Sequence, residues 1–162
     1  MNLKPIKNYE GLYSFDLISN QVWGHKFKKY LKPILKKYVS VTLYKNGKDK
    51  RIPLHRLVYE AHKGPIPQGL FIDHIDNNRQ NNHINNLRLC NISENQCNRK
   101  VQKNNLSTGY KNIYLTNFNT YIVRISKNKK EIYTKTFKTL EEAITNRDIQ
   151  LKLIHKNFHN LG

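Results

Sequence analysis

The chain has 162 residues, a length that suits one ordinary domain or two to three very small ones. Its 29 lysines and arginines against 11 acidic residues give a net charge of +18, which indicates a polyanionic partner, with nucleic acid the first candidate. A ribosome-associated protein is the alternative. An AT-rich genome would favour lysine over arginine but would not explain the shortage of acids. A membrane-spanning protein is disfavoured because no segment approaches ~18 consecutive apolar residues. The first residues also lack a signal-peptide core.

The N-terminal third is expected to be rich in strands. Alternating apolar residues predict strands over residues 9–15, 21–24 and 36–44. Asn46-Gly47 then predicts a hairpin turn that leads toward residues 51–54. Lysines interleaved with aromatic residues lie between the strands, and they fit either a solvated basic face or contacts with phosphates. The residues expected to contact DNA here are Lys26, Lys28 and Lys29.

A short helix is expected over residues 54–62, because its apolar residues follow the i, i+3, i+4, i+7 spacing. Gly64-Pro65 should end it. His55 and His62 flank the apolar face, and we expect them to be structural or to lie near phosphate rather than to bind metal.

Residues 71–98 combine an apolar lead-in, a loop rich in Asn and Asp, and a short alternating run. They predict a strand that ends at Asp73-His74, then a loop, a second strand and a helix. Ser93-x-x-Gln96 has the form of a capping box, which would make Ser93 the N-cap. Asn95 would then lie in the first turn of the helix and face Asp73 across the hairpin. Of the two cysteines, neither of which has zinc-binding spacing, Cys90 is expected to be buried, and both are expected to be reduced.

Asp73 and His74 are suited to different parts of one reaction. Neighbouring residues of a strand point to opposite faces, so the carboxylate can bind metal while the imidazole acts as a base. Imidazoles titrate near neutral pH, as a general base should. A carboxylate plus the amide oxygen of Asn95 is too sparse for calcium and fits a Mg²⁺-type ion that also binds phosphate oxygens. Taken singly, such residues are common in ordinary turns, so only their combined spacing indicates phosphodiester hydrolysis.

The C-terminal third has a different pattern. A polar connector over residues 99–107 shows no periodicity. Strands are then predicted at 113–115, 121–125 and 131–137. A helix is predicted over residues 140–153, with Thr139 and Glu142 forming a capping box at its start.

The spacing of Asp73-His74, Asn86 and Asn95 resembles that of HNH nucleases of the phage and intron homing type with an H-N-N triad. The resemblance implies that His74 is the general base and that Asn86 braces the loop and helps to orient the base. It implies that Asp73 and Asn95 bind one Mg²⁺ ion per active site, with Mn²⁺ as an alternative. The upstream run beginning at His55 also looks like the usual approach to this motif.

The flanking segments carry two further resemblances. The run Tyr9-Glu10-Gly11-Leu12-Tyr13 resembles a small N-terminal module, NUMOD4-like, that is thought to help hold DNA. Residues 107–113, 121–125 and 137–143 are similar to the AP2-type DNA-binding domain, whose exposed sheet face meets DNA. A generic module with a solvated sheet face is the alternative. The counterparts on that face would be Lys111, Tyr114, Arg124 and Lys135.

These features together predict an α+β fold. A ββα-metal (HNH) nuclease core at 51–100 would be flanked by an N-terminal β-rich module at 1–50. A linker at 101–107 would lead to a three-strand-plus-helix AP2-like domain at 108–162. The other basic residues expected to contact DNA are Arg88, Arg99, Lys100 and Lys103.

The resemblance implies a site-specific homing endonuclease that hydrolyses double-stranded DNA with one metal ion, leaving 5′-phosphate and 3′-hydroxyl ends. It would act in the cytoplasm of a bacterial host if the gene is of phage or intron origin. An HNH restriction or repair endonuclease, and a catalytically inactive sequence-specific DNA-binding protein, are the alternatives. One active site per chain indicates a monomer that nicks DNA, or a dimer that cuts both strands.

Overall fold

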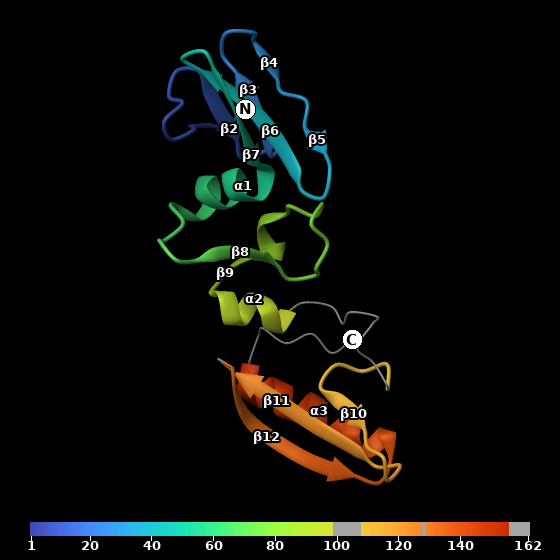
Figure 1. Ribbon diagram of the computed structural model, residues 1–162. Helices are drawn as coiled ribbons and strands as arrows, with labels where there is room; N and C mark the ends of the chain where they lie inside the picture. The colour runs from blue at the N-terminus through green and yellow to red at the C-terminus, as the bar shows by residue number, and fades with distance from the viewer. Residues whose placement is uncertain (99–107, 128, 156–162) are drawn as a thin grey trace. The chain divides into compact units, whose positions relative to one another are not determined.

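The computed structural model describes residues 1–98, 108–127 and 129–155 (Figure 1). The chain divides into two compact units, Met1–Cys90 and Asn91–Gly162. Each unit combines strands with helix around a hydrophobic core of its own, in agreement with the predicted α+β class. No helix within these ranges is long and apolar enough to cross a membrane.

A four-stranded antiparallel sheet of order β1-β2-β3-β4 opens the first unit. Its strands are β1 (Leu3–Pro5), β2 (Tyr13–Asp16), β3 (Gln21–Gly24) and β4 (Lys29–Tyr30). The predicted pairing of β2 with β3 is confirmed. The predicted strand over residues 9–15 was wrong at its start, because residues 9–12 form a turn in which Gly11 has a φ of +74°. Sequence patterns did not reveal β1 and β4.

A second sheet, of order β5-β6-β7, leads into the first helix. Its strands are β5 (Ile34–Leu35), β6 (Val39–Lys45) and β7 (Lys48–Pro53). The turn between β6 and β7 has positive φ at both Asn46 and Gly47, which confirms the predicted hairpin. Helix α1 (Leu54–Lys63) follows as predicted and ends at Gly64.

The first unit closes with a two-stranded hairpin. Its strands β8 (Phe71–His74) and β9 (Leu87–Cys90) pair antiparallel, and the 3₁₀ turn η1 (Ile84–Asn86) precedes β9. One core joins this hairpin to both sheets and to α1, and it includes Phe15, Val22, Leu43, Val58 and Leu87. The boundary predicted at residue 50 therefore falls inside β7, and the segments on its two sides share a core. Cys90 is buried, as predicted, and its Sγ lies 3.6 Å from the carbonyl oxygen of Phe71.

The second unit contains α2 (Ile92–Asn98), a three-stranded sheet and α3 (Leu140–His155). The strands are β10 (Ile113–Leu115), β11 (Tyr121–Lys127) and β12 (Lys130–Phe137), in sequence order, close to the predicted positions. The predicted cap of α3 is confirmed, because Thr139 Oγ1 accepts from the Glu142 amide while Glu142 Oε2 accepts from the Thr139 amide, both at 3.3 Å. The predicted connector at 99–107 lies outside the described residues.

A buried carboxylate ties together the edge of the first sheet. Asp16 is 2% exposed, and its oxygens accept hydrogen bonds from the Tyr30 hydroxyl at 2.5 Å and the Ser19 hydroxyl at 3.0 Å. The backbone amides of Asn2 and Ile18 donate to it at 3.1 Å. The bond from Tyr30, followed by those from the amides and from Ser19, holds the pKa of Asp16 well below its usual range although burial opposes the shift.

This carboxylate should make the stability of the chain dependent on pH. Because the pKa of Asp16 is lower in the folded chain than in the unfolded chain, its stabilisation is complete above pH ~4 and is lost as the pH falls further. Asp16→Asn should therefore lower the melting temperature at pH 7, as measured by thermal denaturation. The difference in melting temperature between the variant and wild type should be smaller at pH 2.5 than at pH 7. The control is the exposed Asp49→Asn. An equal gap for Asp16→Asn at both pH values would contradict this role.

Candidate active site

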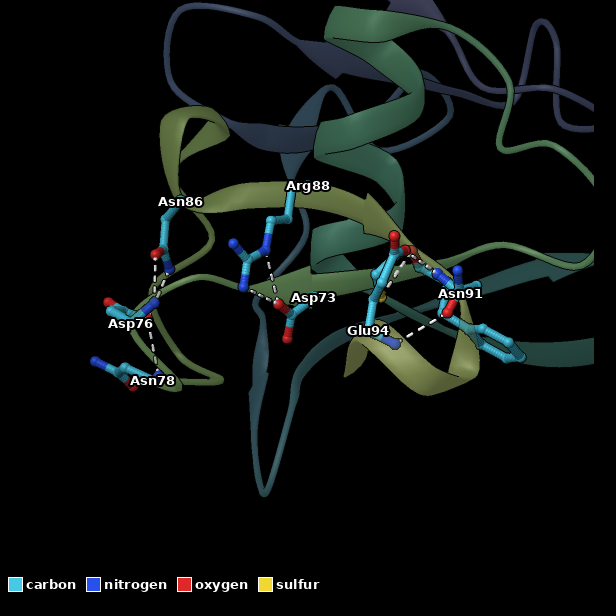
Figure 2. A network of polar contacts seen from close by, with 9 residues as sticks. Asp73, Asp76, Asn78, Asn86, Arg88, Asn91 and Glu94 are labelled. Carbon is cyan, nitrogen blue, oxygen red and sulfur yellow. Dashed lines mark hydrogen bonds and ion pairs between the residues drawn. The ribbon is translucent and has the colours of Figure 1, made fainter. Parts of the chain in front are cut away.

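Asp73 and His74 end strand β8 inside the first unit, and each is 6% exposed. The register with β9 places Asp73 opposite Arg88. Arg88 Nε donates to Asp73 Oδ2 at 2.9 Å, and Arg88 Nη2 lies 2.8 Å from the same oxygen (Figure 2). This ion pair offsets the cost of burying the carboxylate. The guanidinium of Arg88 is thus bound to Asp73. The predicted contact of Arg88 with DNA stays a prediction.

The His74 imidazole is held by a loop residue that sequence reasoning missed. His74 Nε2 lies 3.1 Å from the side-chain oxygen Oδ1 of Asn82, within hydrogen-bond distance. The Asn77 amide donates to the carbonyl of His74 at 2.9 Å, so the chain turns directly after the strand. No sequence signal distinguishes Asn82 from the other asparagines of this loop, since its neighbour Asn81 has the same side chain.

Asn86 braces the loop that follows β8. Its side-chain oxygen accepts from the Asp76 amide at 3.1 Å (Figure 2). Its side-chain nitrogen donates to Asp76 Oδ1 at 2.9 Å and to the carbonyl of Asn81 at 2.8 Å. These bonds agree with the bracing expected of Asn86, whereas the side-chain oxygen of Asn82 lies within hydrogen-bond distance of the His74 ring. A part for Asn86 in orienting the base stays a prediction.

The carboxylate of Asp76 is the centre of this loop. The Asn78 amide donates to Asp76 Oδ1 at 2.8 Å (Figure 2). Asn81 Nδ2 donates to Asp76 Oδ2 at 2.7 Å. Loss of solvation is the largest single influence and raises the pKa of Asp76, but the bonds from Asn81, Asn78 and Asn86 together lower it below its usual range. Asn77 has a φ of +60°, a conformation that asparagine adopts more readily than most residues. The many Asn and Asp residues therefore give the loop a defined shape.

Helix α2 has a different cap from the one predicted. The Glu94 amide donates to Asn91 Oδ1 at 2.9 Å, and the Asn91 amide donates to Glu94 Oε2 at 2.8 Å (Figure 2). Asn91 is thus the N-cap, and the prediction of Ser93 with Gln96 was wrong. Asparagine caps helices as well as serine does, and a Glu carboxylate in the first turn also interacts favourably with the positive end of the helix.

The donor atoms of the first unit fit a hard divalent ion held by few protein ligands. Asp73 supplies a buried carboxylate that is paired with the guanidinium of Arg88. Within the described residues no three His, Cys, Asp or Glu side chains gather in one place. Magnesium-type ions bind through one or two carboxylates together with water and phosphate oxygens. Asn95 belongs to the second unit, so its place opposite Asp73 stays a prediction.

Of the lysines predicted to contact DNA in the first unit, Lys26 and Lys28 lie on the exposed loop between β3 and β4, and Lys29 begins β4. Phe27 lies among these lysines and is 57% exposed. Lys26 Nζ is 5.8 Å and Lys29 Nζ 5.7 Å from the centroid of its ring. Lys28 is exposed beside them and has a φ of +48°. The loop thus presents positive charge around an aromatic ring. The predicted contacts Arg99, Lys100 and Lys103 lie outside the described residues.

The sheet of the second unit separates two of the predicted contacts. Residues paired directly across antiparallel strands share a face. Val123 is buried against α3 and pairs with Lys135, whereas Arg124 is exposed and pairs with Thr134. Thr134 shares the open face with Arg124, and Lys135 follows Thr134 directly, so Lys135 belongs to the opposite face of the sheet. The predicted grouping of Lys135 with Arg124 on one face was therefore wrong.

The other two predicted contacts in this unit differ in exposure. Tyr114 pairs with Ile122 on the open face and is 44% exposed. Lys111 is half-buried just before β10, where its carbonyl accepts from Arg147 Nη1 at 3.3 Å. Tyr114 and Arg124 are therefore the predicted contacts that the open face presents most fully to solvent.

Removing the Asn86 side chain should loosen the loop around Asp76. Each hydrogen bond removed is worth about 1 kcal/mol, which corresponds to a roughly fivefold faster amide exchange where local opening controls it. We expect Asn86→Ala to accelerate exchange of the Asp76 amide, measured by hydrogen–deuterium exchange. Asn85→Ala, at an exposed neighbour, should leave this amide unchanged. Equal protection of the Asp76 amide in Asn86→Ala and wild type would contradict the bracing role.

Residues 53–97 match the family model of the HNH endonucleases. The chain is 51% identical to Protein 3.8 of Escherichia phage T7 over 53 residues, which are 33% of this chain and 44% of that protein. It is 40% identical to DNA endonuclease I-HmuI of Bacillus phage SP01 over 92 residues, which are 54% of this chain and 51% of that protein. The chain thus spans about half the length of these curated relatives.

A solved structure of the HNH homing endonuclease I-HmuI, described as showing DNA binding and cleavage, resembles the fold with a TM-score of 0.56. The sequences are 28% identical, and the match covers 96% of this chain and 92% of that chain. The matched family segment includes β8, β9 and the loop between them. Together these comparisons support a relationship of the chain to the HNH endonuclease family, carried by residues 53–97.

Proposed function

We propose that the chain is a DNA endonuclease that hydrolyses phosphodiester bonds. The observation that carries this proposal is the buried Asp73-His74 pair at the end of β8, with Arg88 bound to the carboxylate and Asn82 within hydrogen-bond distance of the imidazole. The similarity of residues 53–97 to HNH endonucleases supports it. The net charge of +18 fits a polyanionic substrate such as DNA.

His74 is the general base in this proposal. Its imidazole takes a proton from the attacking water, while Asn82 restricts the direction in which the ring nitrogen points. Asp73 and Asn95 would hold a divalent ion. When bound, this ion would neutralise negative charge on the scissile phosphate and on the departing 3′-oxygen. Arg88 keeps the Asp73 carboxylate in a fixed position from the neighbouring strand. The products would carry a 5′-phosphate and a 3′-hydroxyl.

We also propose that the enzyme is of the homing type and recognises a specific site in double-stranded DNA inside a bacterial host. Two surfaces support recognition beyond the cleavage site. One comprises Lys26 and Lys28 of the loop before β4 and Lys29 of β4, beside the exposed ring of Phe27. The other is the open sheet face with Tyr114 and Arg124. Both combine positive charge with an exposed aromatic side chain, which suits contact with a nucleic acid.

Loss of the general base should abolish cleavage and spare binding. Removing such a group typically costs ~10²–10⁴-fold in rate. We therefore expect His74→Ala to reduce the nicking of supercoiled plasmid by this factor with Mg²⁺, and EDTA to stop wild-type cleavage. DNA affinity in EDTA, measured by gel shift, should stay unchanged in the variant.

The matched control is His83→Gln, which changes an exposed histidine of the same loop and keeps a side-chain acceptor for the amide of Asn85. It should cleave at the wild-type rate. Wild-type cleavage by His74→Ala would show that the base is assigned to the wrong residue. A wild-type chain that binds DNA without cutting it under any divalent ion would favour an inactive DNA-binding protein.

The open sheet face should bind phosphate in a way that depends on salt. Removing one basic side chain that binds a phosphate reduces the slope of log K against log salt by about one. Arg124→Ala should lower affinity for duplex DNA and reduce this slope, as measured by fluorescence anisotropy at several salt concentrations. Lys152→Ala removes the same charge from an exposed position on α3 and is the control. Equal effects of the two variants would mean that the sheet face is not the interface.

A further inference from the structure

Two aromatic rings from distant parts of the first unit pack against the ring of the proposed base, His74. The His55 ring, in the first turn of α1, lies 5.1 Å from the His74 ring between centroids, at an interplanar angle of 78°. The Tyr38 ring, just before β6, lies 5.4 Å from His55 and 6.3 Å from His74. His55 thus contacts His74 with edge-to-face geometry, an arrangement that aromatic rings prefer. Tyr38 touches both.

A hydrogen bond at one ring nitrogen does not define the plane of an imidazole. The torsion that turns a histidine ring about its Cβ–Cγ bond has a broad, roughly two-fold profile, so the ring can tilt without leaving its rotamer. Asn82 Oδ1 constrains His74 at Nε2. The rings of Tyr38 and His55, which pack against the imidazole, oppose such a tilt.

His55 is suited to pack beside a base without adding charge. Burial, followed by repulsion from His74 and Arg56, lowers the pKa of His55 to about 4. His55 is therefore neutral at pH 7. Its Nδ1 atom is buried and has no hydrogen-bond partner among the described residues.

We propose that His55 is a positioning residue for His74 and that, together with Tyr38, it fixes the plane of the imidazole for proton transfer. This inference rests on the proposed function, since it concerns the base of that reaction. It extends the site beyond the β8–β9 hairpin, to helix α1 and to the segment that precedes β6. Helix α1 and the segment before β6 would then contribute to catalysis through packing.

Cleavage kinetics with two variants of His55 test the proposal. His55→Ala removes the ring, and His55→Phe replaces it with a ring of similar width that cannot hydrogen-bond. A misplacement of about 1 Å can cost ~10²-fold in rate. We expect His55→Ala to lower the single-turnover rate by roughly 10–100-fold with unchanged KM for DNA. His55→Phe should restore most of the rate and keep or raise the melting temperature.

The state of the His74 ring supplies a readout that does not need cleavage. In metal-free protein labelled with ¹⁵N at histidine, the wild-type ring nitrogens of His74 should give the shifts of one predominant tautomer. His55→Ala should move them toward an average of both, and His55→Phe should not. Circular dichroism and the melting temperature report whether each variant is folded. If His55→Ala does not fold, Tyr38→Ala takes its place, because its ring touches both histidines from an exposed position.

The outcomes separate this proposal from the proposed function. Should the wild-type chain fail to cleave DNA, the endonuclease proposal falls and the nuclear magnetic resonance spectra still decide the role of His55. Should a folded His55→Ala, or Tyr38→Ala in its place, cleave at the wild-type rate with unchanged His74 shifts, the positioning role is overturned. It is also overturned if His55→Phe is folded and as slow as His55→Ala, because ring packing would then not be the property that matters.

Discussion

The antiparallel register of β8 and β9 is the constraint on which the rest of the candidate site depends. It places Arg88 directly across from Asp73, so that a carboxylate can be buried beside a cation instead of being left uncompensated. It also brings His74 to the end of the strand, where the chain turns into the asparagine-rich loop. A slip of one residue would exchange the two faces of the hairpin and separate the carboxylate from its partner.

Polar side chains perform the structural work around this hairpin that apolar packing performs elsewhere. The core beneath it joins both N-terminal sheets, α1 and Leu87 of β9. The loop above it is held instead by Asp76, Asn86 and the asparagines between them. Side chains of this kind can bond to nearby backbone groups and so define a loop without a core of its own. A site assembled in this way keeps polar groups close to a surface that a charged substrate can reach.

The positive charge of the chain is distributed over surfaces with different neighbours. Lys26 and Lys29 surround an exposed phenylalanine, and Arg124 lies on an open sheet face. Arg88 and Arg147 are instead used internally, in ion pairs with Asp73 and Asp148. Net charge therefore indicates the class of partner, whereas the contacts of each basic residue decide whether it can meet that partner.

Local patterns predicted the helices, most of the strands, the α3 cap and the position of Asp73-His74 at a strand end, because periodicity and turn chemistry are local properties. The three-dimensional structure was needed to show that Asn82 contacts His74, that Lys135 lies on the core face of its sheet, and that rings from α1 and the segment before β6 contact His74. Several residues of the same type compete for each of these places. Long-range packing and strand register choose among them, and neither is visible in a local pattern.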